Sequence, residues 1–402
     1  MALMPVAEAL QRVLADAAPL AAEAVPLNEA LGRVLTQDVA ALRTQPPASV
    51  SAMDGYAVRG QDVTSAPVTL QVIGEVAAGH PFDGTVGPGQ AARIFTGGLM
   101  PAGADTVVVQ EVTRRDGDAV IVEKSVAPGR NVRSKGLDFS EGQVLLKKGR
   151  RLTGRDLMLA AAMNHPTVPV YRRPKIAIAG TGDELMPPGS ALQAGQIVFS
   201  NGFALSALAR GEGAEVNDLG IARDKLDDIA AKVREARAWG ADVLVTTGGA
   251  SVGEHDLVQQ ALASEGLDLS FWRVALRPGR PMMHGKVGAM QVLGVPGNPV
   301  SSYVCSYLFL TPLIRRLAGR TDVEQKPEPA RLGRDLPEND ERQDYLRASL
   351  EDGPDGPMAT PLMAQDSSQM ALLARAECLV IRPPHAPAAP AGSSCVILKL
   401  PL

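Results

Sequence analysis

The 402-residue sequence is poor in aromatic side chains, which make up 3% of it, and in cysteine, of which it has three. Few aromatics argue against a surface that stacks nucleic-acid bases. Cys305, Cys378 and Cys395 form no CxxC pair and have no neighbouring histidine, so neither a disulfide framework nor a zinc cluster is expected. Reduced thiols of a cytoplasmic protein are the simplest interpretation.

Excess positive charge and long apolar runs are also absent. Forty Lys and Arg residues against 44 Asp and Glu residues give a net charge of -4, so no overall positive field attracts DNA or an anionic membrane. The longest apolar run, 303–314, is too short to cross a bilayer, and the N-terminal residues favour an amphipathic helix over a signal peptide. We therefore predict a cytoplasmic protein that binds neither nucleic acid nor membrane, so that any anion is bound at a local site.

Glycine and proline are plentiful, with 40 and 31 residues, and they separate short strand and helix patterns. These patterns predict a multidomain α/β plus β protein. Its expected domains are a split helical domain at 1–45 and 140–170, an inserted β-rich domain at 46–139, an α/β domain at 171–319 and a C-terminal β domain at 320–402. Repeated strand, helix, strand units in the α/β segment predict a doubly wound parallel sheet with helices on both faces.

Three loops rich in Gly or Pro follow predicted strands of the α/β segment. They are GTGDEL at 180–185, TTGGASVGEHD at 246–256 and VPGNPVSS at 295–302. The carboxyl ends of parallel strands meet at one edge of a sheet, where ligands bind in open α/β folds. Glycines let backbone N–H groups approach a ligand, and a helix beginning after Gly253 or Asn298 would point its positive end at an anion. A phosphate-bearing ligand is therefore predicted, although each loop taken alone could be an ordinary βα turn.

Carboxylates stand beside these loops, at Asp183, Glu184, Glu254 and Asp256. They would repel a phosphate unless a hard cation lay between them, and carboxylates with phosphate oxygens are typical surroundings of Mg²⁺. A divalent cation is predicted on that condition, and solvated loop acids or helix N-caps are the alternative. Arg277 and Arg280 could bind a phosphate or oxyanion through their guanidinium forks, or could be ordinary surface arginines.

The β-rich segment carries two weaker signals. The string VSAMDGYAVRG at 50–60 places Asp54 before a glycine, which is typical of a hairpin turn. The string IFTGGLMPAGAD at 94–105 includes Thr96 and Gly97, whose hydroxyl and backbone N–H could bind an anion. The sequence has neither GxxxxGK[ST] nor a strand-borne GxGxxG, which argues against Walker-type nucleotidases and Rossmann dehydrogenases.

Taken together, these strings resemble the molybdopterin molybdenumtransferase family, the molybdenum insertases of molybdenum cofactor synthesis. The strings that carry the resemblance, in the family's order and at comparable spacing, are SAMDGYAVR, TGG-x-x-PAGAD, GRNVRSKGLDF, GTGDEL, TTGGASVGEHD, RPGRP and VPGNPVS. DSSQMALLARAECLV is similar to part of the family's last domain, so the resemblance covers nearly the whole chain.

The resemblance implies an elongated homodimer with four domains per chain, the α/β domain being the one that binds molybdopterin. It implies that molybdenum passes from molybdate into adenylylated molybdopterin with release of AMP, supported by Mg²⁺. Contacts with other proteins of molybdenum cofactor synthesis are left open.

The resemblance also implies roles for individual residues. The acids expected in catalysis, of which Glu184 and Asp256 would also ligate the metal, are Asp54, Asp138, Glu184, Asp224 and Asp256. The residues expected to bind substrate are Thr96, Gly97, Gly248, Gly249, Ser251, Arg277, Arg280, Pro296, Asn298 and Pro299. The family commonly has lysines at positions 277 and 280, so arginine keeps the charge there but changes the geometry.

Two other functions are weighed against this one. The first is adenylylation of molybdopterin, the activity of single-domain relatives of the α/β segment; the additional domains argue against it. The second is a non-catalytic scaffold that binds molybdopterin. Retention of Asp54, Asp138, Glu184 and Asp256 argues against a scaffold, because a mere binder gains nothing from acids that repel a phosphate.

Overall fold

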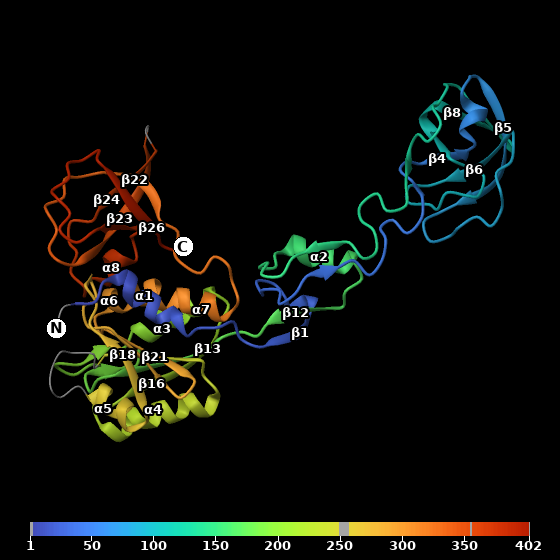
Figure 1. The fold of residues 1–402 in the computed structure, drawn as a ribbon. Coiled ribbons are helices and arrows are strands. Elements are labelled where there is room, and N and C mark those ends of the chain that lie inside the picture. Colours follow the sequence, from blue (N-terminus) through green and yellow to red (C-terminus); the bar gives the residue numbers. More distant parts are fainter. Residues whose placement is uncertain (1–2, 249–256, 354–355, 402) are drawn as a thin grey trace. The chain divides into compact units, whose positions relative to one another are not determined.

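The computed structural model describes residues 3–248, 257–353 and 356–401. Contacts divide the chain into two units, and Figure 1 labels many of their elements. The first unit is Met1–Glu23, Gly32–Thr36 and Val170–Leu402, and the second is Ala24–Leu31 and Gln37–Pro169. Helix α1 (Val6–Ala15) therefore groups with the α/β segment, whereas the predicted boundaries place it with residues 140–170.

A six-stranded sheet forms the centre of the first unit, in the order β16-β13-β17-β21-β20-β18. Its strands are β13 (Lys175–Thr181), β16 (Glu215–Ala222), β17 (Val243–Thr247), β18 (Leu267–Trp272), β20 (Met283–Val287) and β21 (Met290–Val295). The first four strands of that order are parallel, as predicted. The prediction of an entirely parallel sheet is wrong for β20 and β18, because a two-residue turn at Gly288 and Ala289 returns β20 directly into β21 as a hairpin.

Helices cover both faces of this sheet (Figure 1). They are α1, α3 (Asn201–Gly211), α4 (Leu226–Trp239), α5 (Leu257–Ser264), α6 (Pro299–Cys305) and α7 (Thr311–Leu317), with a π-helical turn at Ser306–Leu310 joining the last two. Ile176 and Ile178 of β13 pack with α1, α3, α6 and α7, whereas Ala177 and Ala179 pack with α4 and α5. Successive strand residues face opposite sides of a sheet, so this apolar run builds both cores and confirms the doubly wound domain.

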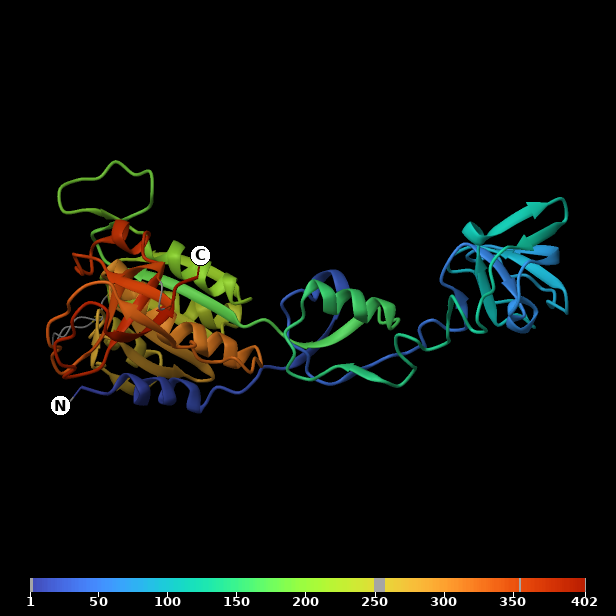
Figure 2. The same ribbon diagram turned by 90° about the horizontal axis from the view of Figure 1, so that it is seen from above.

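The C-terminal domain is a closed β-barrel. Its elements are β22 (Glu328–Leu332), β23 (Gln343–Gly353), β24 (Gly356–Pro361), β25 (Cys378–Arg382), β26 (Ser394–Lys399) and the short helix α8 (Met370–Leu373). Strand β23 pairs with both β24 and β25, so the order β23-β24-β22-β26-β25 closes on itself. Barrel residues Tyr345, Leu379 and Leu398 share a core with the helices of the α/β domain. Figure 2 shows the barrel, in orange to red, beside that domain.

Two short pairings complete the first unit. Strand β19 (Leu276–Arg277) runs from the α/β segment and pairs with β23 of the barrel. Strands β14 (Leu185–Met186) and β15 (Ile197–Val198) pair with each other after the GTGDEL loop. The first pairing ties the barrel to the RPGRP segment, and the second frames the loop that carries Glu184.

The second unit contains another six-stranded sheet, in the order β7-β4-β6-β5-β9-β8. Its strands are β4 (Gly55–Val58), β5 (Val68–Val76), β6 (Gln90–Ile94), β7 (Thr106–Val109), β8 (Thr113–Asp116) and β9 (Ala119–Val122). Smaller pairs are β3 (Val50–Ser51) with β10 (Val132–Arg133) and β2 (Val39–Ala40) with β11 (Val144–Leu146). A third pair, β1 (Ala22–Pro26) with β12 (Thr167–Tyr171), has residues assigned to both units. The segments predicted to be helical thus contain more strand than expected.

Helix α2 (Gly154–Ala162) forms where the sequence predicts it. A capping box starts this helix: the backbone N–H and the hydroxyl of Thr153 both donate to Asp156 Oδ2, each at 2.8 Å. Within the described residues, no helix combines the length and apolar character that crossing a bilayer requires.

Candidate functional site

The ends of β13, β17 and β21 border a cavity of about 820 Å³, called here the edge cavity. The predicted site residues that line it are Glu184, Asp224, Gly248, Pro296, Asn298 and Pro299. They come from four loops that are far apart in the sequence. Parallel strands bring their carboxyl ends to one edge, so the sheet topology explains why these residues meet.

Gly248 fixes the shape of the cavity floor. Its φ is +100°, a conformation that favours glycine, and a Cβ atom built on it would lie 2.3 Å from the Thr181 carbonyl oxygen. Gly297 of the neighbouring loop also approaches Gly248, because a Cβ atom on Gly297 would lie 3.4 Å from the Gly248 Cα atom. The three loops therefore pack backbone against backbone, and a side chain at position 248 would push them apart.

Buried polar side chains connect these loops. Asn201, at the start of α3, donates from Nδ2 to Thr247 Oγ1 at 2.7 Å and to the Gly297 carbonyl oxygen at 2.8 Å. Thr181 lines the cavity, and its buried hydroxyl has no hydrogen-bond partner among the described residues. Such a hydroxyl is available to a ligand. Asn201, Thr247 and Thr181 were not among the predicted site residues, although each is a polar side chain at the end of an apolar strand or the start of the next helix.

Acidic side chains stand at the rim of the cavity. Asp183 and Asp224 lie side by side, since the N–H of Asp183 is 3.4 Å from Asp224 Oδ2 and the N–H of Asp224 is 3.3 Å from Asp183 Oδ1. The Glu184 carboxylate lies over Gly182, where a Cβ atom would come within 2.5 Å of Glu184 Oε2. Across the described parts of the chain, three or more His, Cys, Asp or Glu side chains nowhere gather closely enough to hold a metal ion by themselves.

Part of the predicted site lies outside the described residues. These positions are Gly249, Ser251, Gly253, Glu254 and Asp256. The role of Asp256 as a second metal ligand therefore stays a prediction.

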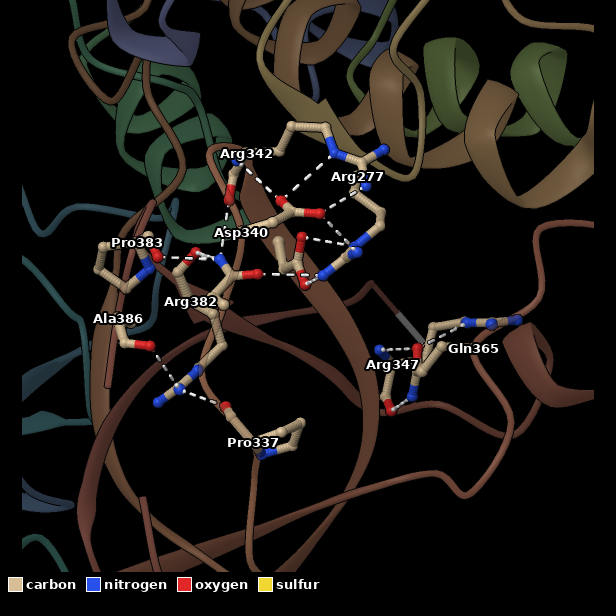
Figure 3. Close-up of polar contacts among 11 residues, drawn as sticks. Arg277, Pro337, Asp340, Arg342, Arg347, Gln365, Arg382, Pro383 and Ala386 are labelled. Atoms are coloured by element: carbon tan, nitrogen blue, oxygen red, sulfur yellow. Dashed lines mark hydrogen bonds and ion pairs between the residues drawn. The ribbon is translucent and has the colours of Figure 1, made fainter. Parts of the chain in front are cut away.

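The two predicted anion-binding arginines differ in their surroundings. Arg277 is half-exposed, and its Nε donates to Asp344 Oδ1 at 2.8 Å while its terminal nitrogens donate to Asp340 and Asn339, each at 3.0 Å (Figure 3). Arg280 is exposed, and its side chain has no hydrogen-bond partner among the residues described. The structure thus assigns Arg277 a barrel contact, and its substrate role stays a prediction.

The pKa values of Asp344 and Asp340, the two acids that bind Arg277, shift in opposite directions. Burial raises the pKa of Asp344, although the ion pair with Arg277 opposes this. The side chain of Arg342, helped by the charge of Arg277, lowers the pKa of Asp340 to about 2. At neutral pH these charges hold the barrel acids and the RPGRP segment together.

The barrel also supplies one wall of the edge cavity, which the sequence analysis did not assign. Ser368 and Met370 line it. Asn298 Nδ2 donates to Ser367 Oγ at 2.9 Å, and the N–H of Val300 donates to the Ser367 carbonyl oxygen at 3.1 Å. The DSSQM string is visible in the sequence, but its position beside the VPGNP loop depends on how the barrel closes.

In the second unit, Asp54 and Thr96 are joined directly. Asp54 Oδ1 accepts hydrogen bonds from the Thr96 N–H at 2.7 Å and from its hydroxyl at 2.8 Å. These bonds to the backbone and hydroxyl of Thr96 hold the pKa of Asp54 below its usual range. The prediction of an Asp-Gly hairpin is wrong, because β3 pairs with β10 while β4 pairs with β6 and β7.

Gly97 and Asp138 line a second cavity, of about 590 Å³, within the same unit. Arg43 and Arg133 also line it. Gly97 has a φ of +82°, and the Asp138 N–H donates to the Gln45 carbonyl oxygen at 3.0 Å. The structure thus groups Gly97 with Asp138, next to the Asp54–Thr96 pair, and gives this cavity positive side chains suited to an anion.

Three family models match successive parts of the chain. Residues 4–164 match the family model "MoeA N-terminal region (domain I and II)", residues 177–316 match "Probable molybdopterin binding domain", and residues 329–400 match "MoeA C-terminal region (domain IV)". The chain is 42% identical to a molybdopterin molybdenumtransferase of Nostoc sp., over 74% of this chain and 70% of the relative. It is 34% identical to one of Bacillus subtilis, over 94% of this chain and 90% of the relative.

Solved structures agree over the full length. A crystal structure of the molybdopterin biosynthesis MoeA protein from Pyrococcus horikoshii has a TM-score of 0.86 and 32% identity, covering 99% of each chain. A second structure of that protein has a TM-score of 0.81 and 29% identity, covering 99% of this chain and 100% of the other.

Proposed function

The chain belongs to the molybdopterin molybdenumtransferase (MoeA) family, and from this premise we propose that it transfers molybdenum from molybdate into adenylylated molybdopterin with release of AMP. The observation that carries the proposal is the edge cavity, where loops of the molybdopterin-binding domain meet acids and a free hydroxyl. Its volume of about 820 Å³ is within the range of small-molecule sites.

In this proposal the edge cavity holds the pterin and its phosphates. The Gly248 backbone and the Thr181 hydroxyl face the ligand, while Asn298 of the loop after β21 and Ser368 of the barrel close the site. Glycine at position 248 lets the backbone approach a phosphate without a side chain between them. Arg280, which is exposed beside Pro281 of the cavity lining, supplies positive charge near the entrance.

The acids at the rim fit Mg²⁺ as a cofactor. Mg²⁺ is usually held by one or two carboxylates together with substrate phosphates and waters, and Glu184 with Asp224 would supply those carboxylates. When bound, Mg²⁺ would offset the charge repulsion between two anionic substrates. Without a cation, acids at this position would oppose phosphate binding.

Asp54, Thr96, Gly97 and Asp138 form the second part of the proposed machinery. The two hydrogen bonds from Thr96 favour the ionised form of Asp54, which lowers the pKa of this carboxyl group, and they fix the Thr96 backbone and hydroxyl. We propose that this pair orients an oxygen of a substrate or of water during transfer. The chain is further proposed to act as a cytoplasmic homodimer, the assembly that the sequence resemblance implies.

Adenylylation of molybdopterin is the alternative that these observations disfavour. The chain matches the family over the N-terminal and C-terminal regions as well as over the molybdopterin-binding domain. A single-domain adenylyltransferase would not require those regions.

The test supplies purified protein with Mg²⁺, molybdate and either adenylylated molybdopterin or molybdopterin plus ATP. We expect AMP to appear with adenylylated molybdopterin, without ATP, and to depend on molybdate. Formation of adenylylated molybdopterin from ATP, with no AMP release from it, would instead support the alternative.

A further inference from the structure

Arg347 is the most unusual charged residue of the barrel. It lies on β23, is only 1% exposed, and is among the largest fully buried side chains of the described residues. Burial lowers the pKa of its guanidinium, because a charge loses hydration in the protein interior. A buried guanidinium is stable only when its donors are hydrogen-bonded, so its partners show what it holds in place.

The partners of Arg347 belong to one loop, residues 364–369. Terminal nitrogens of the guanidinium donate to the Asp366 carbonyl oxygen at 3.0 Å, to that of Gln369 at 3.2 Å and to that of Ala364 at 3.4 Å. Gln365 completes the arrangement, since its Oε1 accepts from Arg347 N at 3.0 Å and its Nε2 donates to Arg347 O at 2.9 Å (Figure 3). The loop is thus wrapped around one fixed side chain.

The same loop forms a wall of the edge cavity. Ser368 lines the cavity, and Ser367 accepts the hydrogen bond from Asn298 described above. The Asp366 carboxylate holds the turn that contains both serines, because its Oδ1 accepts hydrogen bonds from the Ser368 N–H at 2.8 Å and from the Ser368 hydroxyl at 2.5 Å. One side of the loop therefore contacts Arg347 and the other side faces the substrate position.

We propose that Arg347 is a positioning residue for molybdenum transfer, which holds the 364–369 loop so that Ser368 lines the edge cavity and Ser367 keeps its hydrogen bond with Asn298. The inference rests on the proposed function, because it assumes that adenylylated molybdopterin occupies that cavity. The planar guanidinium of Arg347 donates to three carbonyl oxygens at once, and the ammonium group of a lysine cannot do this with the same geometry.

Arg382 provides a matched control. It is also buried in the barrel, at 8% exposure, and it also donates to backbone carbonyl oxygens, those of Pro337 at 2.9 Å and Pro387 at 2.6 Å. Within the described chain, these three residues are absent from the lining of the edge cavity. Loss of either arginine removes a buried guanidinium, but only loss of Arg347 releases the loop beside the substrate.

The experiment compares Arg347→Met, Arg382→Met and wild type in AMP release and in thermal unfolding. We expect both variants to unfold at lower temperature, and Arg347→Met alone to raise the KM for adenylylated molybdopterin about tenfold with a smaller change in kcat. Arg347→Lys should also raise the KM, by a smaller factor than Arg347→Met. An unchanged KM in Arg347→Met, or an equal rise in Arg382→Met, would overturn the proposal.

A double-mutant cycle with Ser368→Ala tests whether Arg347 acts through the loop. If it does, the factor by which KM rises in the double variant is well below the product of the factors for the two single variants, because both changes disturb the same contact. Independent, multiplicative effects would contradict the proposal. If Arg347→Met does not fold, Gln365→Ala removes one support of the loop and should raise KM about threefold.

Hydrogen exchange separates this inference from the proposed function. Amides of 364–369 should exchange faster in Arg347→Met than in Arg382→Met, and adenylylated molybdopterin should protect them in wild type. Protection without AMP release in wild type would reject the proposed reaction and retain the positioning role. AMP release with equal exchange in both variants would reject the positioning role alone.

Discussion

The edge cavity and the Asp54–Thr96 pair show two ways of building a functional site. The edge cavity collects residues from position 181 to position 370, and it takes its shape from sheet topology and from backbone packing at Gly248. The Asp54–Thr96 pair depends on two hydrogen bonds from one residue to one carboxylate oxygen. Substitutions of the packed backbone in the first region should therefore act mainly through shape and binding, whereas substitutions of the acids in either region, or of their hydrogen-bond partners, should act mainly through charge and turnover.

The largest loss of AMP release is expected for Glu184→Ala, which removes a negative charge from the rim of the edge cavity without changing the backbone that shapes it. AMP release should fall by about 100-fold or more, because the change removes a carboxylate proposed to hold Mg²⁺ beside the substrate phosphates. Binding of adenylylated molybdopterin, measured at equilibrium, should change by less than about threefold. Glu215→Ala, at an exposed position on β16, is the control and should retain wild-type turnover. Unchanged turnover in Glu184→Ala would remove the role assigned to this acid.

Gly248→Ala tests the claim that backbone shape governs the edge cavity. The new Cβ would lie 2.3 Å from the Thr181 carbonyl oxygen at a φ of +100°, so we expect a loss of about 1–3 kcal/mol in the free energy of unfolding. The KM for adenylylated molybdopterin should rise about tenfold.

The matched control for that change is Gly240→Ala at the end of α4. Gly240 also has a positive φ, +76°, but a Cβ atom there would meet no described atom within 4 Å. Gly240→Ala should lower the free energy of unfolding by about 1 kcal/mol and leave the KM for adenylylated molybdopterin unchanged. Equal KM values for the two variants would contradict the role of backbone packing.

Thr96→Ala addresses the other side of the comparison. It removes the hydroxyl bond to Asp54 and keeps the backbone bond, so kcat should fall about tenfold with little change in KM. The pKa of Asp54 should rise towards its ordinary value, because one of the bonds that favour the ionised form is lost. An NMR titration of the Asp54 carboxyl group measures that shift. A rise in KM without a change in kcat would mean that this pair binds substrate instead.

The smallest expected effect is on the pH dependence of stability, through Asp340 beside Arg277. The pKa of Asp340 is about 2 in the folded protein and about 4 in an unfolded chain, so its stabilising contribution is complete above pH 4 and is lost as pH falls towards 2. Asp340→Asn should therefore flatten the fall of unfolding temperature with pH over that interval. A profile as steep as that of wild type would contradict the assigned ion pair.

Much of the fold could be predicted because the sequence pattern repeats. Short apolar strands followed by Gly-rich loops and helices predicted the doubly wound domain, and strand polarity then placed the three loops at one edge. The hairpin of β20 and β21 was missed because its turn has only two residues, Gly288 and Ala289, and lacks the Asn-Gly or Asp-Gly pair that marks many hairpins.

The rest of the site could not be predicted because it depends on contacts between domains that are distant in sequence. Nothing local indicates that Ser367 accepts a hydrogen bond from Asn298, or that Arg277 binds Asp340 and Asp344 of the barrel. Asp54 and Thr96 could be assigned only through the family resemblance, since their hydrogen bonds span 42 positions of sequence.

The most direct test of the account is the molybdenum content of the pterin product for each AMP released by wild-type protein. We expect one molybdenum atom to be transferred to the pterin per AMP, with both products absent when molybdate is left out. Release of AMP without molybdenum in the product would contradict it, because the protein would then be hydrolysing adenylylated molybdopterin without inserting the metal.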